Sequence, residues 1–568
     1  MSAILSADDL NDFISPGVAC IKPVETLPAA PPKDNPYEVI LEDKAPQTLT
    51  PAQISLTDCL ACSGCVTSAE AVLVSLQSHN EVLANLAAPS SKDKKFIALV
   101  SPQTRASLAV TYGVTEKQVG WMIEQLLCGS EGIRTATLES EENGQSKIRG
   151  FDLVLDTNIA EEIALHYAAE ELLASLSQPA GEGISKKKPI LTSACPGFVC
   201  YLESTQPALI PHLSTLKSPQ AILGTAVKTL LQPESGPSGV YVVGIMPCFD
   251  KKLEGARGEL TSAAWGPTTD EAPVRDVDCV ITTRELISLA QSLNLDFSTL
   301  PRKPLTQQAP ASDAVLSLLS RPGRVPLTDH TAGTSGGYLT HIVARLIEQT
   351  PGAQLRVEKG RNVDTVDYVV FRPPSADGEQ EEVIARLARC YGFRNIQNLV
   401  RRLKPAKTRV LPRFGKAQAA IAARKAKTAA GAAGSVGSEY AYVEVMACPG
   451  GCTNGGGQVK FNDEIALPMS SESTQNQKEW VARVDEAYYS AGEEEEEGRN
   501  GGVRGGVNGV RGERVEAFVK AWEGRTGIEK EKLLFTGYRQ VENDLGKTQE
   551  VDVVARAAEL AMKAGGGW

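Results

Sequence analysis

Three short apolar segments of this 568-residue chain run directly into cysteine, and this pattern constrains the fold more than any other feature. The segment PILTSA precedes Cys195, VYVVGIM precedes Pro247 and Cys248, and YAYVEVM precedes Ala447 and Cys448, with Cys452 one turn later. Each segment has the length and the β-branched or aromatic content of a buried strand. Because ligands in open α/β folds bind outside the carboxyl ends of strands, these four thiols can converge on one site.

Strand-like segments alternate with helical patterns from Lys95 onward. KFIALVS, FDLVLDT, DCVITT and VDYVVF are further short strands, and TEKQVGWMIEQLL, AEEIALHYAAEELLASL and HIVARLIEQ are helical. This alternation predicts an α/β architecture with mainly parallel sheets. The chain is 42% apolar and long enough for several domains.

The beginning and the charge of the chain exclude several classes of protein. MSAILSADDLNDF lacks the features of a secretory signal, and no run approaches the roughly 18 apolar residues of a membrane span. We therefore expect the cytosol or nucleus, where twelve cysteines are metal ligands or buried residues rather than disulfides. The net charge of −11, and the scarcity of aromatics in the basic stretch Arg401–Lys427, argue against nucleic-acid binding.

The segment EVMACPGGCTNGGGQ favours a ligand role for the four cysteines, Cys195, Cys248, Cys448 and Cys452, which we call the four-cysteine site. Four thiolates suit zinc or an iron–sulfur cluster. A [4Fe–4S] cluster needs nearby backbone and N–H donors, and the glycines remove Cβ atoms that would obstruct it. Lys251 and Lys252 can offset its charge. Burial as small apolar residues is the alternative, and zinc and iron both stay open.

A second cysteine set lies near the N-terminus, in DCLACSGC. Cys59, Cys62 and Cys65 form a C-x2-C-x2-C run, which is typical of ferredoxin-type clusters, whereas zinc sites more often pair two distant C-x2-C motifs. Cys20 is the only other cysteine among the first 127 residues, so we nominate it as the fourth ligand. Zinc is the main alternative, because metal-free exposed thiols would oxidise.

The remaining chemistry of the chain is less specific. Only five histidines exist and none lies in a cysteine motif, which disfavours Cys/His zinc sites and Cys–His nucleophiles. Cys128 and Cys390 lie in helical patterns and Cys279 opens a strand, so we expect all three in the core. Cys200 can line the four-cysteine site but is left outside its ligand set.

Several motifs together resemble a known family. TSACPGF, MPCFDKKLE and EVMACPGGCTNGGGQ resemble, in the same order, the motifs around the active-site cluster of iron-only hydrogenases. AGTSGGYL resembles their intervening glycine-rich stretch, and KLLFTGY resembles their small-subunit region. The resemblance covers residues 95–470 and 510–545, and it implies a two-lobed α/β body. It makes the four-cysteine site a [4Fe–4S] site, and Lys251 matches a lysine that hydrogen-bonds the neighbouring di-iron subsite of hydrogenases.

Two departures from the hydrogenase pattern argue against hydrogenase activity. Ala194 stands where hydrogenases carry a proton-relaying cysteine, and their multi-cluster electron-relay domain is missing. The chain instead resembles the hydrogenase-like cytosolic iron–sulfur assembly factors of eukaryotes, the nuclear prelamin-A-recognition-factor family. In that family Cys20, Cys59, Cys62 and Cys65 would hold an N-terminal [4Fe–4S] cluster. An iron-only-hydrogenase-type redox enzyme is the alternative.

This second resemblance implies an iron–sulfur carrier or adaptor that is not an enzyme. Such a protein, with two [4Fe–4S] clusters, links an early cluster scaffold to the targeting complex that matures cytosolic and nuclear apoproteins. It implies a cytoplasmic location, with the nucleus as a second one, and no membrane partner. The terminal Trp568 partly matches the aromatic ends by which proteins of this pathway dock on the targeting complex.

The chain divides into five predicted parts. These are an N-terminal iron–sulfur module, a first α/β lobe, a second α/β lobe, an acidic and glycine-rich flexible insertion, and a C-terminal helical small-subunit-like segment, over residues 1–94, 95–300, 301–470, 471–515 and 516–568. Disorder is expected in Gly492–Gly512 because of its low complexity.

Overall fold

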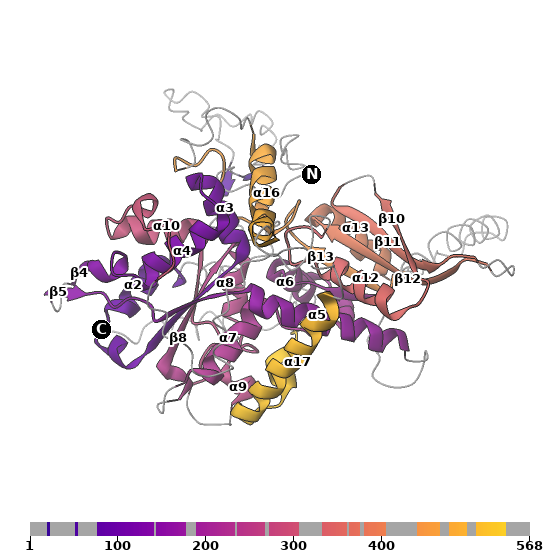
Figure 1. Cartoon of the computed structure of the whole chain (residues 1–568), viewed down its shortest axis with the longest axis horizontal. Coiled ribbons are helices and arrows are strands. Elements are labelled where there is room, and N and C mark those ends of the chain that lie inside the picture. Colours follow the sequence, from indigo (N-terminus) through magenta and orange to yellow (C-terminus); the bar gives the residue numbers. More distant parts are fainter. Residues whose placement is uncertain are drawn as a thin grey trace, which may run out of the picture.

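The computed structural model describes the α/β body and its C-terminal segment (Figure 1). The described residues are 20–22, 52–54, 76–140, 144–177, 189–232, 236–266, 272–305, 332–360, 363–374, 380–404, 440–465, 476–496 and 507–540. None of the helices in these ranges is both long and apolar enough to span a membrane.

The first sheet consists of four parallel strands in the order β6-β3-β8-β9. Their bounds are Leu153–Asp156, Lys95–Val100, Val240–Met246 and Cys279–Thr282. Successive side chains of a strand point to opposite faces. Ile97 and Leu99 accordingly lie in one hydrophobic core, while Phe96 and Ala98 lie in another. The sheet is therefore covered on both faces, as all-parallel sheets require.

The second sheet is mixed and has the order β10-β11-β12-β13-β7. Its strands are Gln354–Lys359, Thr365–Arg372, Glu382–Tyr391, Tyr442–Met446 and Ile190–Thr192. The pairs β10–β11 and β11–β12 are antiparallel, whereas β12–β13 and β13–β7 are parallel. In Figure 1 most of this sheet lies to the right of β8.

The two sheets share a hydrophobic core. Residues of α5 (Asn158–Ser177), α7 (Pro219–Leu230) and α12 (Tyr338–Gln349) contribute to it together with strand residues from both sheets. Strand β7, although early in the chain, hydrogen-bonds with β13 in the second sheet. The division at residue 300 stays a prediction, and one strand of residues 95–300 belongs to the second sheet.

Helices begin where the sequence provides caps. Ser101 caps α3 (Pro102–Tyr112) directly after β3, and Thr282 begins a capping box for α10 (Thr283–Ser292) directly after β9. These short strand-to-helix connections place residues that follow the strands at one edge of the sheet. The other helices are α2, α4, α6, α8, α9 and α13, at His79–Ala87, Glu116–Cys128, Pro196–Thr205, Asp250–Gly255, Ser262–Trp265 and Phe393–Leu403.

Small elements complete the described body. Two pairs of short antiparallel strands are β1–β2 and β4–β5, at Cys20–Lys22, Ala52–Ile54, Thr137–Ser140 and Gly144–Lys147. The 3-10 helices are η1 to η6, at Pro89–Asp93, Ile133–Thr135, Pro207–His212, Pro237–Gly239, Phe297–Thr299 and Cys452–Asn454.

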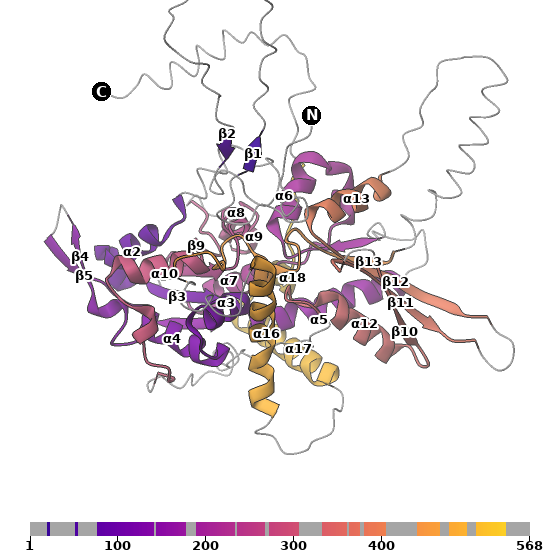
Figure 2. The same ribbon diagram turned by 90° about the horizontal axis from the view of Figure 1, so that it is seen from above.

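The expected flexible insertion is wrong for residues 477–496, which form helix α16 (Gln477–Glu496), and for residues 507–515, which belong to helix α17 (Val507–Thr526). In both views α16 lies beside α3 (Figures 1 and 2). Trp480, Val484 and Tyr488 are buried in the core beside α3 and α4. Their spacing of four residues places them on one helix face, and burial of that face outweighs the glycine and glutamate content nearby.

The C-terminal segment packs along the first lobe. In α17 (Val507–Thr526) the buried Trp522 donates a hydrogen bond of 2.9 Å from Nε1 to Thr229 Oγ1. Beyond α18 (Lys530–Leu534), the amide of Thr536 donates to the carbonyl of Thr215, and the Tyr538 hydroxyl donates to the carbonyl of Ser214. The KLLFTGY motif therefore packs against the segment that leads into α7.

All seven predicted strands form, and so do the three helices predicted between them. The expectation of helix around Cys390 is wrong, since this residue lies in β12 between β11 and β13. The pattern IARLARCY has helical spacing, but pairing on both sides and burial favour a strand. The predicted terminal helix at VVARAAELAMKA lies outside the described residues.

Candidate metal centre

The four predicted ligand cysteines follow the ends of strands that belong to both sheets. Cys195 follows β7 and is the N-cap residue of α6, while Cys248 lies between β8 and α8. Cys448 follows β13, and Cys452 is the first residue of η6. The two sheets therefore both contribute thiols, which no single local sequence element could do.

The charges of the four thiols influence one another's pKa values. Burial raises the pKa of Cys248 well above its usual range, and the charges of Asp250, Cys448, Cys195 and Cys452 raise it further. Burial likewise raises the pKa of Cys448, with added contributions from Cys195 and Cys452. Burial therefore favours the neutral form of these thiols. Binding of a metal or cluster would have to release their protons.

Hydrogen-bond donors point at the Cys195 sulfur. Burial raises the pKa of its thiol to about 12, while backbone hydrogen bonds from Ala447 and Phe198 oppose that rise. The Cys195 amide donates to Ser193 Oγ at 3.2 Å, and Ser193 Oγ donates to the Val445 carbonyl at 2.6 Å. The thiol is thereby fixed between the ends of β7 and β13. Donors of this kind stabilise a thiolate that ligates a cluster.

Ser335 holds the Cys452 loop. The Cys452 amide donates to Ser335 Oγ at 3.0 Å, and a side-chain hydrogen bond from Ser335 lowers the pKa of the Cys452 thiol against the larger effect of burial. Thr334 Oγ1 lies 2.8 Å from Thr453 Oγ1. The AGTSGGYL segment, for which the sequence predicted no individual role, therefore packs directly on the loop of Cys452. The small polar residues of this segment were the sequence feature that could have indicated its packing on that loop.

The glycines of the Cys452 loop allow close packing of protein on protein. A Cβ at Gly451 would lie 2.8 Å from Thr334 Oγ1, and the φ of Gly451 is +114°. A Cβ at Gly455 would lie 2.4 Å from the Pro247 carbonyl oxygen, and one at Gly457 would lie 2.5 Å from a Thr282 methyl group. The observed contacts thus explain these glycines by the close approach of the loop to Thr334, Pro247 and Thr282, rather than by the room a cluster needs.

The two adjacent lysines have different roles. The charge of Lys251 lowers the pKa of Cys452, and its Nζ donates to Glu254 Oε2 at 2.5 Å. Lys252 Nζ instead donates to the Gln77 carbonyl at 2.6 Å and to Glu285 Oε1 at 2.7 Å. The expectation that both lysines offset charge at the site is therefore supported for Lys251 only. Lys460, which the sequence did not indicate, lowers the pKa of Cys448.

Three buried carboxyl groups influence the pKa values of Cys248 and Cys452. Burial raises the pKa of Asp250 to about 7, and its Oδ1 has no hydrogen-bond partner among the described residues. Burial also raises the pKa of Glu161 to about 7, with a further contribution from the charge of Glu444. Glu444 accepts hydrogen bonds from the Tyr391 hydroxyl at 2.7 Å and from the Leu339 amide at 2.8 Å. Burial thus favours the neutral form of these three acids, which interact with the thiols of Cys248 and Cys452.

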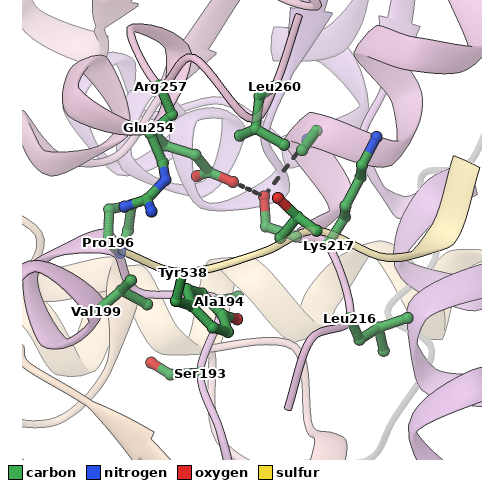
Figure 3. A pocket seen from close by; sticks show the side chains of 13 residues that line it. Ser193, Ala194, Pro196, Val199, Leu216, Lys217, Glu254, Arg257, Leu260 and Tyr538 are labelled. Atoms are coloured by element: carbon green, nitrogen blue, oxygen red, sulfur yellow. Dashed lines mark hydrogen bonds between the residues drawn. The ribbon is translucent and has the colours of Figure 1, made fainter. Parts of the chain in front are cut away.

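A cavity borders Ala194, the residue that departs from the hydrogenase pattern (Figure 3). It offers about 40 Å³ to water-sized molecules, which is room for a few waters. Ser193, Ala194 and Pro196 line one side, while Glu254 and Tyr538 line others (Figure 3). Ser218 donates a hydrogen bond to Glu254 in the same cavity. The Ala194 methyl group therefore borders a small cavity whose lining is mainly apolar.

The remaining predicted residues differ in how far the structure describes them. Cys59, Cys62 and Cys65 lie outside the described residues, as does Trp568. Cys20 lies in β1, where its backbone is paired opposite Ile54 of β2. Cys279 and Cys390 are buried as expected, whereas Cys128 and Cys200 are partly buried.

Single-ion geometry is not present in the described part of the chain. No group of three or more His, Cys, Asp or Glu side chains there is arranged around a point suited to one metal ion. A cubane is larger than a single ion and spaces its ligands further apart. A zinc ion and a [4Fe–4S] cluster therefore require different spacings of the same four sulfur atoms.

Comparisons with known proteins identify the fold and the family. The model of the family "Iron only hydrogenase large subunit, C-terminal domain" matches residues 132–456. The solved structure of a variant of the apo [FeFe]-hydrogenase HydA1 from Chlamydomonas reinhardtii is 22% identical with a TM-score of 0.53, over 82% of this chain and 99% of that one. This likeness confirms the predicted hydrogenase-like α/β fold.

Full-length relatives are more similar. The protein called cytosolic Fe-S cluster assembly factor nar1 from Aspergillus clavatus is 48% identical over 615 aligned positions, and 100% of both chains is covered. The protein of the same name from Phaeosphaeria nodorum is 47% identical, again over 100% of both chains. Together with the strand-end thiols, these matches show that the chain belongs to the family of cytosolic iron–sulfur cluster assembly factors, built on an iron-only-hydrogenase-like body.

Proposed function

We propose that this protein is a non-enzymatic carrier or adaptor of cytosolic iron–sulfur protein assembly that holds two [4Fe–4S] clusters. The observation that carries the proposal is the position of four thiols after three strand ends, one buried and three partly buried, with backbone donors on Cys195 and a serine donor on Cys452. Four thiolates with such donors fit a [4Fe–4S] cluster. Cys195, Cys248, Cys448 and Cys452 would hold it, and the bound cluster would supply redox or transfer capacity.

The second cluster of this proposal belongs to Cys20, Cys59, Cys62 and Cys65. Pairing of Cys20 with Ile54 supports it, because Ile54 precedes Cys59 by only five residues. Five residues span at most about 18 Å, so the distant cysteine starts near the C-x2-C-x2-C run. The strand pairing thus favours Cys20 as the fourth ligand.

The proposed role does not include hydrogen production. Ala194 has no exchangeable side-chain proton, so it cannot relay protons through the cavity that it borders. Lys251 is engaged with Glu254 beside the carboxyl groups near Cys452. We expect no hydrogen evolution from the wild-type protein, measured by gas chromatography with reduced methyl viologen. Sustained turnover would instead favour the redox-enzyme alternative.

The partners in this proposal are an early cluster scaffold and the late targeting complex, with apoproteins served indirectly. The printed names of the relatives support the cytosol as the location, and the nucleus is part of the proposal. Trp568 is proposed to dock on the targeting complex. Deletion of Trp568 should reduce recovery of that complex in a pull-down without loss of iron.

Complementation tests the function directly. A fungal strain depleted of its own family member would receive the wild-type chain, Cys62→Ala, or the double variant Cys448→Ala/Cys452→Ala. We expect the wild type to restore the activity of a cytosolic [4Fe–4S] enzyme, and both variants to fail at equal protein level. Cys128→Ala, a cysteine outside both sets, is the matched control and should restore activity. Full restoration by either ligand variant would contradict the proposal.

A further inference from the structure

The junction between the N-terminal segment and the body is fixed by one buried amide. Gln77, at the start of the continuously described chain, is 4% exposed and makes three contacts. Its Nε2 donates to the Lys252 carbonyl at 2.8 Å, its Oε1 accepts from the Val280 amide at 3.1 Å, and its own carbonyl accepts from Lys252 Nζ at 2.6 Å. Gln77 therefore binds both α8 and β9.

Lys252 is the centre of this junction. Its side chain is 2% exposed, and its Nζ also donates to Glu285 Oε1 at 2.7 Å. Glu285 Oε2 in turn accepts from the Thr282 amide as part of the capping box of α10. The Lys252 ammonium also lies 5.5 Å from the Phe249 ring centre. A buried ammonium with two strong acceptors has one well-defined position, because losing either acceptor would leave a buried charge poorly solvated.

These contacts connect the segment that follows the N-terminal cysteine set with the body of the protein. Lys252 lies four residues after Cys248, on the helix that begins directly behind this cysteine. Gln77 lies twelve residues after Cys65. The chain that leaves the N-terminal cysteine set is therefore attached to the short helix α8 of the four-cysteine site, at a sequence separation of 175 residues.

We infer that Lys252 is a positioning residue, which with Gln77 anchors the cysteine-rich N-terminal segment to the helix behind Cys248. The inference rests on the proposed function for the meaning of the two cysteine sets, but the anchor itself is independent of their cargo. Helix α2 has its own apolar contacts through Val82, Leu83 and Leu86. Loss of the anchor should therefore release the chain before α2 without releasing α2.

The test compares Lys252→Met with Lys228→Met in the full-length protein. Lys228 is equally buried and pairs with Asp278 at 2.7 Å in the same lobe, but it does not contact Gln77. Both variants lose a buried ion pair. Lys252→Arg retains the charge and the donors and is the rescue variant. The readouts are thermolysin cleavage before Ser78, amide hydrogen exchange of residues 77–81, iron content, and restoration of a [4Fe–4S] enzyme in depleted cells.

We expect cleavage and exchange to be at least about tenfold faster in Lys252→Met, close to wild type in Lys252→Arg, and unchanged in Lys228→Met. Client enzyme activity should fall several-fold in Lys252→Met while its iron content stays at the wild-type value. Equal exchange in Lys252→Met and wild type would overturn the anchor. Equal changes in both methionine variants would also overturn it, since they would indicate a general loss of stability. A wild-type iron content of four per chain would instead contradict the two-cluster proposal. The anchor would then still be tested by the hydrogen-exchange comparison alone.

Discussion

At the scale of single residues, glycine at one position decides whether the Cys452 loop can form. Gly451 has φ +114° and ψ −173°, a region essentially limited to glycine. The absence of a Cβ at Gly451 also leaves room for Thr334 and Ser335. The side-chain oxygens of these two residues would lie only 2.8 and 3.0 Å from an added Cβ. The neighbouring Gly450 has φ +74° and would bring a Cβ into open space. The two glycines therefore differ in what they contribute.

Gly451→Ala should lower the free energy of unfolding by about 1–3 kcal/mol from backbone strain, with a further loss from the contacts. Gly450→Ala should cost only about 1 kcal/mol, since alanine tolerates the left-handed region with modest strain. Denaturant unfolding of both variants, together with iron content after anaerobic reconstitution, measures the difference. A larger loss in Gly450→Ala would contradict this assignment.

A second residue-scale prediction concerns Glu161, whose pKa is raised from 4.5 to about 7 by burial and by Glu444. Between these pH values the native state binds a proton that the unfolded state has lost, so wild-type stability falls as pH rises through this window. Glu161→Gln removes this dependence. Its stability relative to wild type should increase by up to about 3 kcal/mol from pH 4.5 to 8 in cluster-free protein.

Denaturant unfolding at several pH values measures this change. Glu170→Gln, on the same helix with a side chain 46% exposed, is the matched control. A difference between Glu161→Gln and wild type that is constant with pH would mean that Glu161 does not retain its proton on folding.

At the scale of elements, alternation and apolar content were enough to predict the buried strands and their connecting helices. Strands that pair on both sides, such as β3 and β13, have continuous apolar runs that are easy to recognise. Neither the pairing of β7 with β13 nor the strand at Cys390 could be predicted, because both depend on contacts between distant segments. Helix α16 was missed because its low-complexity end masked the periodic Trp480, Val484 and Tyr488.

Helix α16 supplies the element-scale prediction. Trp480 is 1% exposed, and its Nε1 donates to the Val459 carbonyl at 2.9 Å. Val459 follows the Cys452 loop closely in the sequence. Trp480→Ala should lower the free energy of unfolding by about 3–5 kcal/mol, as for other buried aromatics. Glu486→Ala, on the exposed face of the same helix, should change it by less than about 0.5 kcal/mol. Equal stability of the two variants would show that α16 does not pack as described.

At the scale of the whole molecule, the four-cysteine site joins two sheets that also share a core. The residues that carry thiols could be predicted from the sequence, since strand ends and glycine-rich loops mark them. Their surroundings could not, because Ser335 and Lys460 reach the site from segments whose placement depends on the complete fold. Gln77, which follows the N-terminal cysteine set in the sequence, is attached to this body through Lys252.

The central claim is that eight cysteines hold two [4Fe–4S] clusters, four at each site. The most direct measurement is iron and acid-labile sulfide per chain, in anaerobically purified wild type and in the double variant Cys448→Ala/Cys452→Ala. The account predicts about eight of each for the wild type and about four of each for the variant, as four-thiolate cubanes require. Retention of all eight irons by the variant, or zinc in place of iron in the wild type, would contradict it.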